Sequence, residues 1–163
     1  MSDYHLKQAQ EILQSIHYAT IATVSDKGKP WNSPVAHRFD DDLTIYWFSD
    51  KTSQHSQNIR ANGDIFIVIY DSKAPDGEGE GTYIEAKAYE LTDPEEIIAS
   101  GVRKDPKTEG PDEFMGDAIS RVYKAVPQRV WLNDAEMQNG KFIRDFKVEV
   151  SLNELKGLWN EHA

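Results

Sequence analysis

Apolar residues recur at intervals of three and four at the start of the chain, a spacing that places them on one face of a helix. The residues with this spacing are Leu6, Ala9, Leu13 and Ile16. The pattern predicts a helix over residues 3–16. We expect its apolar face to lie against the strands that follow.

The next segments alternate between strand-like and turn-like sequences. Residues 19–24 are dense in β-branched types, and residues 25–30 contain the Asp, Gly and Pro that favour a tight reversal. Strands are predicted over residues 31–39 and 43–48, separated by consecutive aspartates. This order predicts an antiparallel meander.

A short, mostly solvated helix is predicted over residues 52–62, which have polar capping candidates in front and Asn-Gly behind. The apolar run at 65–70 predicts a central strand, and the Pro- and Gly-rich segment 72–81 predicts a loop. A further strand is expected over 83–91.

Asp93, Pro94 and Glu96 then supply an N-cap, a proline at the first helical position and a glutamate at the third, which together predict a helix. A second helix is predicted after Pro111, because apolar residues there share one helical face. These residues are Phe114, Met115, Ala118, Ile119 and Val122. Strands near 128–132 and 141–150 and a short helix at 152–159 complete the chain.

This order of elements predicts an α+β fold built on a six-stranded or seven-stranded antiparallel β-barrel with peripheral helices. Strands arrive as meanders, and closure of a barrel removes exposed strand edges. A parallel βαβ arrangement does not fit. The sequence contains no internal repeat and no long linker, so we expect residues 1–163 to form a single domain.

Composition narrows the possible chemistry. The chain has no cysteine, which excludes disulfides, thiolate metal sites, iron–sulfur clusters and thiol nucleophiles. Its 18 basic and 28 acidic residues give a formal charge of -10, which disfavours nucleic acid and anionic lipid as partners. No signal-like or membrane-length apolar run is present, so we expect a cytoplasmic protein without a membrane partner.

Common sequence signatures of catalysis are absent from the chain. It contains no GxGxxG, GxxxxGK[ST], GxSxG or HExxH motif. Its five histidines, at positions 5, 17, 37, 55 and 162, have no close ligand spacing, and we expect no metal site. Without cysteine, any redox activity must come from a bound cofactor.

The segment 47–59 is the strongest local candidate for a binding site. A predicted strand ends there and a short helix begins, so the hydroxyls of Ser49, Thr52 and Ser53 and the free N–H groups of the first turn can converge on an anion. Ordinary helix capping explains the same residues without a ligand, and local physics alone favours that explanation.

Three longer patterns change this balance. They are ATIATVSDKGKPWNSPVAHRF, LTIYWFSDKTSQHSQNIRANGDIFIVIYD and GTYIEAKAYELTD. In order and spacing they resemble the pyridoxamine 5'-phosphate oxidase-like superfamily of FMN-binding split barrels, especially its bacterial general-stress-protein branch. The resemblance covers residues 15–93 well. It implies a six-stranded split barrel that forms a homodimer and holds flavin mononucleotide (FMN) at the dimer interface.

The resemblance also implies where the flavin lies. The segment 33–36 should follow the isoalloxazine ring, Phe48 and Ser49 should contact the flavin and its ribityl phosphate, and Trp131 is placed to approach the flavin. Ser53, Gln54 and His55 occupy the positions where the oxidase has a Ser-Arg-Lys run that binds the phosphate. The expected cofactor-binding residues are Ser33, Pro34, Val35, Ala36, Arg38, Phe48, Ser49, Thr52, Ser53, Gln54, His55 and Trp131.

Two departures from the family pattern matter. Gln54 and His55 replace permanent cations, which leaves one titratable imidazole, hydroxyls, amides and the candidates Arg38, Lys51 or Arg60 to meet a phosphate. We therefore expect reduced FMN affinity that depends on pH near neutrality. The oxidase's Arg-Leu-His-Asp-Arg signature is also missing, so we expect no oxidation of pyridoxamine phosphate.

Three functions remain open at this point. The first is an FMN-dependent oxidoreductase or reductase of an unknown small molecule, in which the flavin performs the electron chemistry. The second is a non-catalytic flavin store, sensor or stress-response module. The third is a branch of the family that has exchanged FMN for haem or a deazaflavin. The sequence does not separate them.

Overall fold

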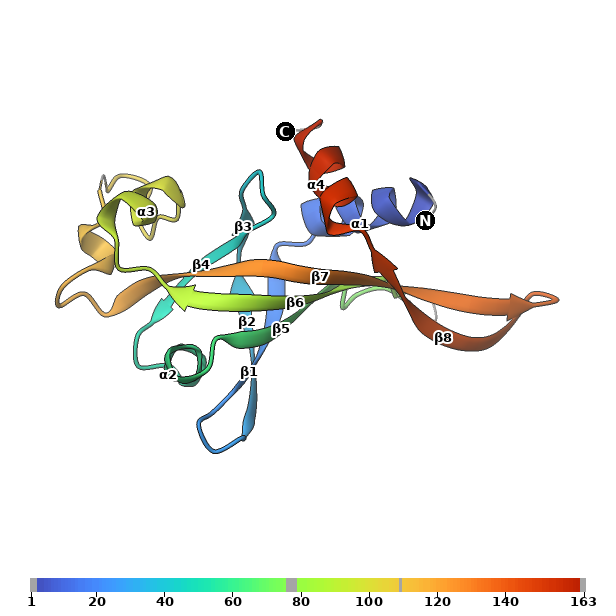
Figure 1. Cartoon of the computed structure of the whole chain (residues 1–163), viewed down its shortest axis with the longest axis horizontal. Coiled ribbons are helices and arrows are strands. Elements are labelled where there is room, and N and C mark those ends of the chain that lie inside the picture. The colour runs from blue at the N-terminus through green and yellow to red at the C-terminus, as the bar shows by residue number, and fades with distance from the viewer. Residues whose placement is uncertain (1–2, 76–78, 109, 162–163) are drawn as a thin grey trace.

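The computed structural model describes residues 3–75, 79–108 and 110–161 (Figure 1). The expected loop at 72–81 lies partly outside these residues, at 76–78. The elements in chain order are α1 (Asp3–Ser15), β1 (Tyr18–Val24), β2 (Pro30–Ala36), β3 (Arg38–Phe39), β4 (Ile45–Asp50), α2 (Gln54–Ala61), β5 (Asp64–Tyr70), β6 (Gly81–Glu90), α3 (Pro94–Ala99), the 3-10 helix η1 (Asp112–Phe114), β7 (Ser120–Gln138), β8 (Lys141–Val150) and α4 (Leu152–Asn160).

The described strands form one eight-stranded sheet in which every pair is antiparallel. Its order is β2-β1-β5-β6-β7-β4-β3, and β8 pairs with the far part of β7. The predicted α+β class and the antiparallel meanders are confirmed. The predicted count of six or seven strands is wrong, because the expected strand at 31–39 is divided into β2 and β3.

A single residue joins the two ends of this sheet. β2 and β3 stand at opposite ends of the strand order, yet only His37 separates them in the sequence. The His37 N–H donates to the His17 carbonyl at 3.4 Å, and Arg38 then pairs with Tyr46 on β4. The sheet therefore curls until one bent segment supplies both of its edges, which is the geometry of a split barrel.

The barrel is filled by side chains from alternate positions of its strands, as the two-residue period of a strand requires. Ile21, Ile67 and Ile84 are almost fully buried on successive strands, and the rings of Trp47 and Tyr123 stack at 5.8 Å. The strand predicted at 65–70 lies within the sheet, but its residues alternate between buried and exposed. One face of β5 therefore stays at the surface.

The helix predicted after Pro111 is wrong. Only the short 3-10 helix η1 forms there, and Gly116, with a φ of +54°, follows it. Ile119 is exposed, and Val122 lies within β7, where it pairs with Phe48 of β4. The apolar spacing fits both a helix and a strand, and pairing with β4 and β6 decides the outcome. The strand expected at 128–132 is one part of this 19-residue strand.

The helix predicted at 52–62 forms as α2, but it is not mostly solvated. Four of its eight residues are buried, because the helix packs against β1 and β6. These residues are His55, Ser56, Asn58 and Ile59. The helices predicted at 3–16, after Asp93 and at 152–159 are confirmed.

β7 and β8 extend well beyond the body as a two-stranded arm (Figure 1). Asn139 and Gly140 both have positive φ at its tip, as a tight hairpin turn requires. Met137 and Phe142 face each other near the tip and are exposed. None of the helices within the described ranges has the length and apolar character needed to cross a membrane.

The residue that joins the two sheet edges should make stability depend on pH. Burial, followed by the effect of nearby His17, lowers the pKa of His37 from 6.5 to about 4. The unfolded chain therefore binds more protons than the folded chain between these values, and stability is lost as pH falls through this range. Urea unfolding at pH 7 and pH 4.5 should show that His37→Gln removes about 2 kcal/mol of this loss. An equal loss in both proteins would contradict this assignment.

Candidate functional site

Ser53 is the N-cap of α2. Its Oγ accepts a hydrogen bond from the Ser56 N–H at 3.4 Å and donates to Ser56 Oγ at 2.8 Å. The Ser56 hydroxyl in turn donates to the Asp50 carbonyl at 2.8 Å. The capping role considered from the sequence is therefore present, and it fixes the start of α2 at the end of β4.

His55 does not provide a cation beside Ser53. Its side chain is buried, and Nε2 lies 3.2 Å from the Ser53 Oγ. Burial lowers the pKa of the imidazole, so it is uncharged at neutral pH. The expectation that ligand affinity depends on pH near neutrality stays a prediction.

The hydrogen-bond donors of Thr52 are also used within the protein. Its backbone N–H and its hydroxyl both donate to Asp50 Oδ1, at 2.6 and 2.7 Å. These bonds hold the pKa of the Asp50 carboxyl below its usual range. A solvated negative charge therefore stands at the turn between β4 and α2, and the Thr52 hydroxyl is not free to donate to a ligand.

The first turn of α2 nevertheless offers donors. Within the described residues, no acceptor pairs with the backbone N–H of Gln54 or of His55. The first N–H groups of a helix have no partner inside the helix and carry partial positive charge. The turn can therefore accept a small anion through its backbone.

A ladder of buried amides and hydroxyls holds Gln54 in place. Asn58, which is 2% exposed, donates to Thr23 Oγ1 at 2.9 Å and accepts from Gln54 Nε2 at 2.8 Å. The Thr23 hydroxyl donates onward to the Trp31 carbonyl at 3.4 Å. These bonds connect the core of the barrel, β2 and the start of α2, and they leave a cavity between α2 and the β1–β2 turn.

This turn cavity has a volume of about 300 Å³. Its lining residues come from the turn, the start of β2 and α2: Ser25, Asp26, Lys27, Lys29, Pro30, Trp31, Gln54 and Asn58. The sequence analysis missed Lys27 and Lys29, because lysines in a polar turn look like ordinary solvated residues. Only the folded chain brings them to the helix.

A second cavity, of about 250 Å³, lies at the other end of β2 and brings together Ala36, Arg38 and Phe48. Gly101, after α3, has a φ of +64°, and a Cβ there would stand 2.1 Å from Arg38 Nη1. The glycine therefore lets the guanidinium lie against the backbone. Within the described residues Arg38 has no ion pair, while Arg103 lines the same cavity.

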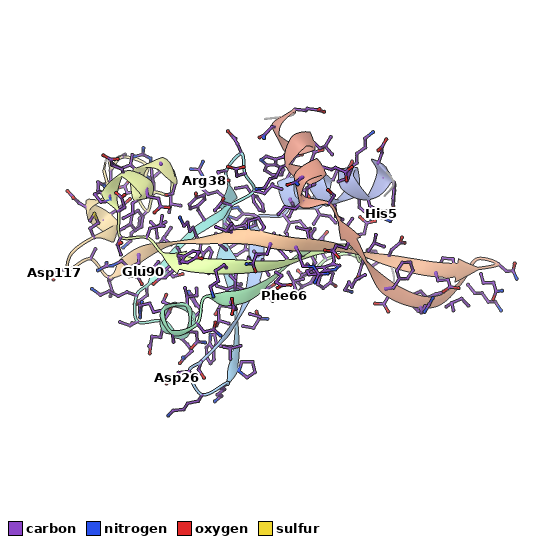
Figure 2. All side chains as sticks on the ribbon, in the orientation of Figure 1. His5, Asp26, Arg38, Phe66, Glu90 and Asp117 are labelled. Carbon is purple, nitrogen blue, oxygen red and sulfur yellow. The ribbon has the colours of Figure 1, made fainter. Side chains whose placement is uncertain are left out.

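The two cavities lie at opposite ends of the β2–β3 segment. Figure 2 labels Asp26 at the turn and Arg38 on the other side of the body. β2 pairs only with β1 among the described strands, so its other edge carries unpaired backbone groups. An elongated ligand can lie along this edge.

The remaining predicted residues on β2 and β4 have mixed positions. Ser33 Oγ accepts from Trp31 Nε1 at 3.0 Å, and Pro34 is exposed. Val35 is buried in the core, so only its backbone faces outward. Ser49 is half-buried, and its ladder partner is Arg121 on β7.

Trp131 lines neither of these cavities. It stacks on Phe66 with the ring centroids 6.1 Å apart, and the Arg129 guanidinium lies 4.6 Å from the Trp131 ring centroid. With Tyr83 and Lys147 these rings border a separate hollow of about 200 Å³. The structure thus brings together Ala36, Arg38 and Phe48, and separately places Gln54 at the turn cavity, but it sets Trp131 apart from both groups.

Arg60, considered above as a phosphate-binding cation, is occupied by other contacts. Its guanidinium donates to Glu90 Oε2 at 2.7 Å and to the Lys51 carbonyl at 2.6 Å. Glu90 also accepts from the Tyr123 hydroxyl at 3.0 Å. This network joins α2 to β6 and β7, so Arg60 has a structural role in the isolated chain.

A further cavity, of about 370 Å³, is lined by two imidazoles, of His17 and His37. Ile16, Phe39 and Trp159 give it an apolar wall. The Nδ1 atom of His37 is buried without a hydrogen-bond partner in the described structure. No group of three His, Asp or Glu side chains suited to a metal ion occurs within residues 3–75, 79–108 and 110–161.

Comparison with solved structures gives many proteins of the same fold at low sequence identity. A haem-binding protein from Mycobacterium smegmatis has a TM-score of 0.67 at 16% identity, over 93% of this chain and 60% of that one. HutZ, the haem storage protein of Vibrio cholerae, has a TM-score of 0.59 at 14% identity, over 76% of this chain and 91% of that one.

A third structure covers nearly the whole of both chains. It is a protein from Clostridium acetobutylicum related to general stress protein 26, of the pyridoxinephosphate oxidase family, with a TM-score of 0.64 at 12% identity, over 95% and 99% of the two chains. The chain also spans 60% of a protein of unknown function from Agrobacterium tumefaciens. Likenesses at this identity show the fold.

Sequence comparison provides the family assignment. No curated protein matches the chain. The family model for pyridoxamine 5'-phosphate oxidase matches residues 6–131, which include β1 to β6 and most of β7. With the split-barrel order of the strands, this match shows that the chain belongs to the pyridoxamine 5'-phosphate oxidase family.

Proposed function

We propose that this chain binds FMN along the free edge of β2 and acts as an FMN-dependent oxidoreductase on a small molecule other than pyridoxamine phosphate. The observation that carries the proposal is the pair of cavities at the two ends of this edge. One has the exposed aromatic ring of Phe48 and the guanidinium of Arg38, which has no ion pair among the described residues. The other adjoins the start of α2. This polarity suits a ligand with a planar ring at one end and a phosphate at the other.

The chain's own residues would bind and orient the flavin. The unpaired backbone groups of β2 would meet the polar edge of the ring, and the N–H groups of Gln54 and His55 would meet the phosphate. When bound, FMN supplies two-electron chemistry between a donor and an acceptor. The absence of cysteine from the chain agrees with a redox function that depends on the cofactor and with a cytoplasmic location.

We also propose that two copies form a homodimer with FMN between them. Phe66, Trp131 and Tyr83 form an aromatic patch on the outer face of the sheet, and Phe66 is 38% exposed. Trp131 lies apart from both β2 cavities in its own chain, so its expected approach to the flavin requires a second copy. Large exposed aromatic groups are typical of protein interfaces.

Haem binding is the second candidate, and the His17–His37 cavity favours it. Burial keeps the His37 imidazole uncharged at neutral pH, and a neutral imidazole is the form that binds iron. Apolar side chains border the same cavity, with Arg38 at its edge to meet a carboxylate. Two relatives of the same fold bind or store haem by name.

The visible spectrum of freshly purified protein separates the two candidates. We expect a yellow protein, or a colourless one that takes up added FMN, whose flavin is released on denaturation and is reduced by hydride transfer from a reduced nicotinamide. A Soret band that weakens in His37→Gln would favour haem. Protein that ignores FMN in titration would refute the flavin proposal.

The phosphate end can be tested through the N-cap. Ser53→Asp keeps a strong N-cap but places a carboxylate beside the proposed phosphate, so FMN affinity should fall by about ten-fold or more. Ser53→Asn is the matched control, because it caps as well without adding charge. Isothermal titration of both variants with FMN measures the difference. Equal affinities would place the phosphate elsewhere.

The aromatic patch can be tested by sedimentation velocity. The parent protein should sediment as two chains, and Phe66→Glu should sediment as one, because a charge in an apolar interface is costly. Ile98→Glu on α3, which changes an exposed apolar residue outside the patch, should remain a dimer. A monomeric parent protein, or a dimeric Phe66→Glu variant, would count against the proposed interface.

A further inference from the structure

The turn cavity contains cations in a chain that is otherwise strongly acidic. Lys27 and Lys29 line it from the β1–β2 turn, and Gln54 and Asn58 line it from α2. Neither lysine has a carboxylate partner within the described residues, although the chain has 28 acidic side chains. Asp26 is the single acidic residue in the described lining.

The turn that presents these lysines is well ordered. Ser25 N–H donates to the Lys29 carbonyl, Gly28 N–H donates to the Ser25 carbonyl, and both distances are 2.9 Å. The Lys29 N–H donates to Ser25 Oγ at 3.1 Å, and Gly28 has the φ of +75° that this reversal needs. These bonds hold the shape of the turn that carries both lysines.

The other cations considered for phosphate binding either make contacts within the protein or lie away from the turn cavity. Arg60 is held by Glu90 and by the Lys51 carbonyl, and Arg38 lines the cavity at the far end of β2. His55 is uncharged at neutral pH. Lys51 does not line the turn cavity. Lys27 and Lys29 are therefore the cations that line the turn cavity together with Gln54.

We infer that Lys27 and Lys29 hold the FMN phosphate in this chain, in place of the Arg-Lys pair that the oxidase carries at the positions of Gln54 and His55. This inference rests on the proposed flavin function. Lys27 and Lys29 from the turn and Gln54 from the start of α2 line one cavity, which suits a doubly charged phosphate. The positive charge that faces the phosphate is thus kept, but lysines of the β1–β2 turn supply it in place of residues on the helix.

The test compares FMN with riboflavin, which has the same ring and no phosphate. Titration by flavin fluorescence should show that the parent protein binds FMN at least about ten-fold more tightly than riboflavin. In the double variant Lys27→Gln/Lys29→Gln this preference should be lost, while riboflavin affinity stays the same. Asp26→Asn should change the preference in the opposite direction, because it removes the negative charge from the cavity.

The matched control is Lys73→Gln/Lys107→Gln, which removes the same charge from two exposed turns. Each of these lysines follows an aspartate by two residues and bonds to it through the backbone, so both turns should be kept. The control should retain the parent preference for FMN. A Lys27→Gln/Lys29→Gln variant that also retains it overturns this inference while leaving flavin binding intact. A parent protein that binds neither flavin overturns the proposed function instead.

Discussion

The bend at His37 is the constraint on which the rest of the structure depends. Because β2 continues into β3 through this one residue, the same segment pairs with β1 on one side of the barrel and with β4 on the other. The sheet cannot close its hydrogen-bonded ladder across the bend, so β2 keeps a free edge. Both cavities lie at the ends of that edge. The bend also buries the His37 imidazole, which stays neutral there.

Buried polar groups determine how α2 sits beside this edge. The polar side chains of Thr23 and Asn58 would be costly to bury without hydrogen bonds. Asn58 donates to Thr23, and it also accepts a hydrogen bond from Gln54. The ladder therefore ties the first turn of α2 to β1 and to the turn that follows. A network of this kind is stabilising only when it is complete, so it fixes a single orientation for the donors at the helix start.

The sequence predicted elements whose local signals agree with their tertiary surroundings. Asp93 and Pro94 mark the start of α3, and the β-branched run of β1 alternates as a strand should. The apolar spacing after Pro111 fits both a helix and a strand, and pairing with neighbouring strands decides in favour of the strand. His55 is buried because α2 packs on β1 and β6, and no local pattern reports that. The lysines of the turn cavity depend on contacts distant in sequence, so only the fold reveals them.

Local charge, rather than net charge, decides whether an acidic chain can hold an anion. Fields from distant surface carboxylates are largely screened beyond about 8 Å at physiological salt. Lys27 and Lys29 lie on a short turn beside the first N–H groups of α2, so their charges act at short range on a ligand in the turn cavity. Lysine is a hydrated point charge on a flexible stem, whereas arginine binds phosphate through a rigid pair of donors. A phosphate held by these two lysines would therefore be bound with less geometric constraint than a phosphate held by arginine.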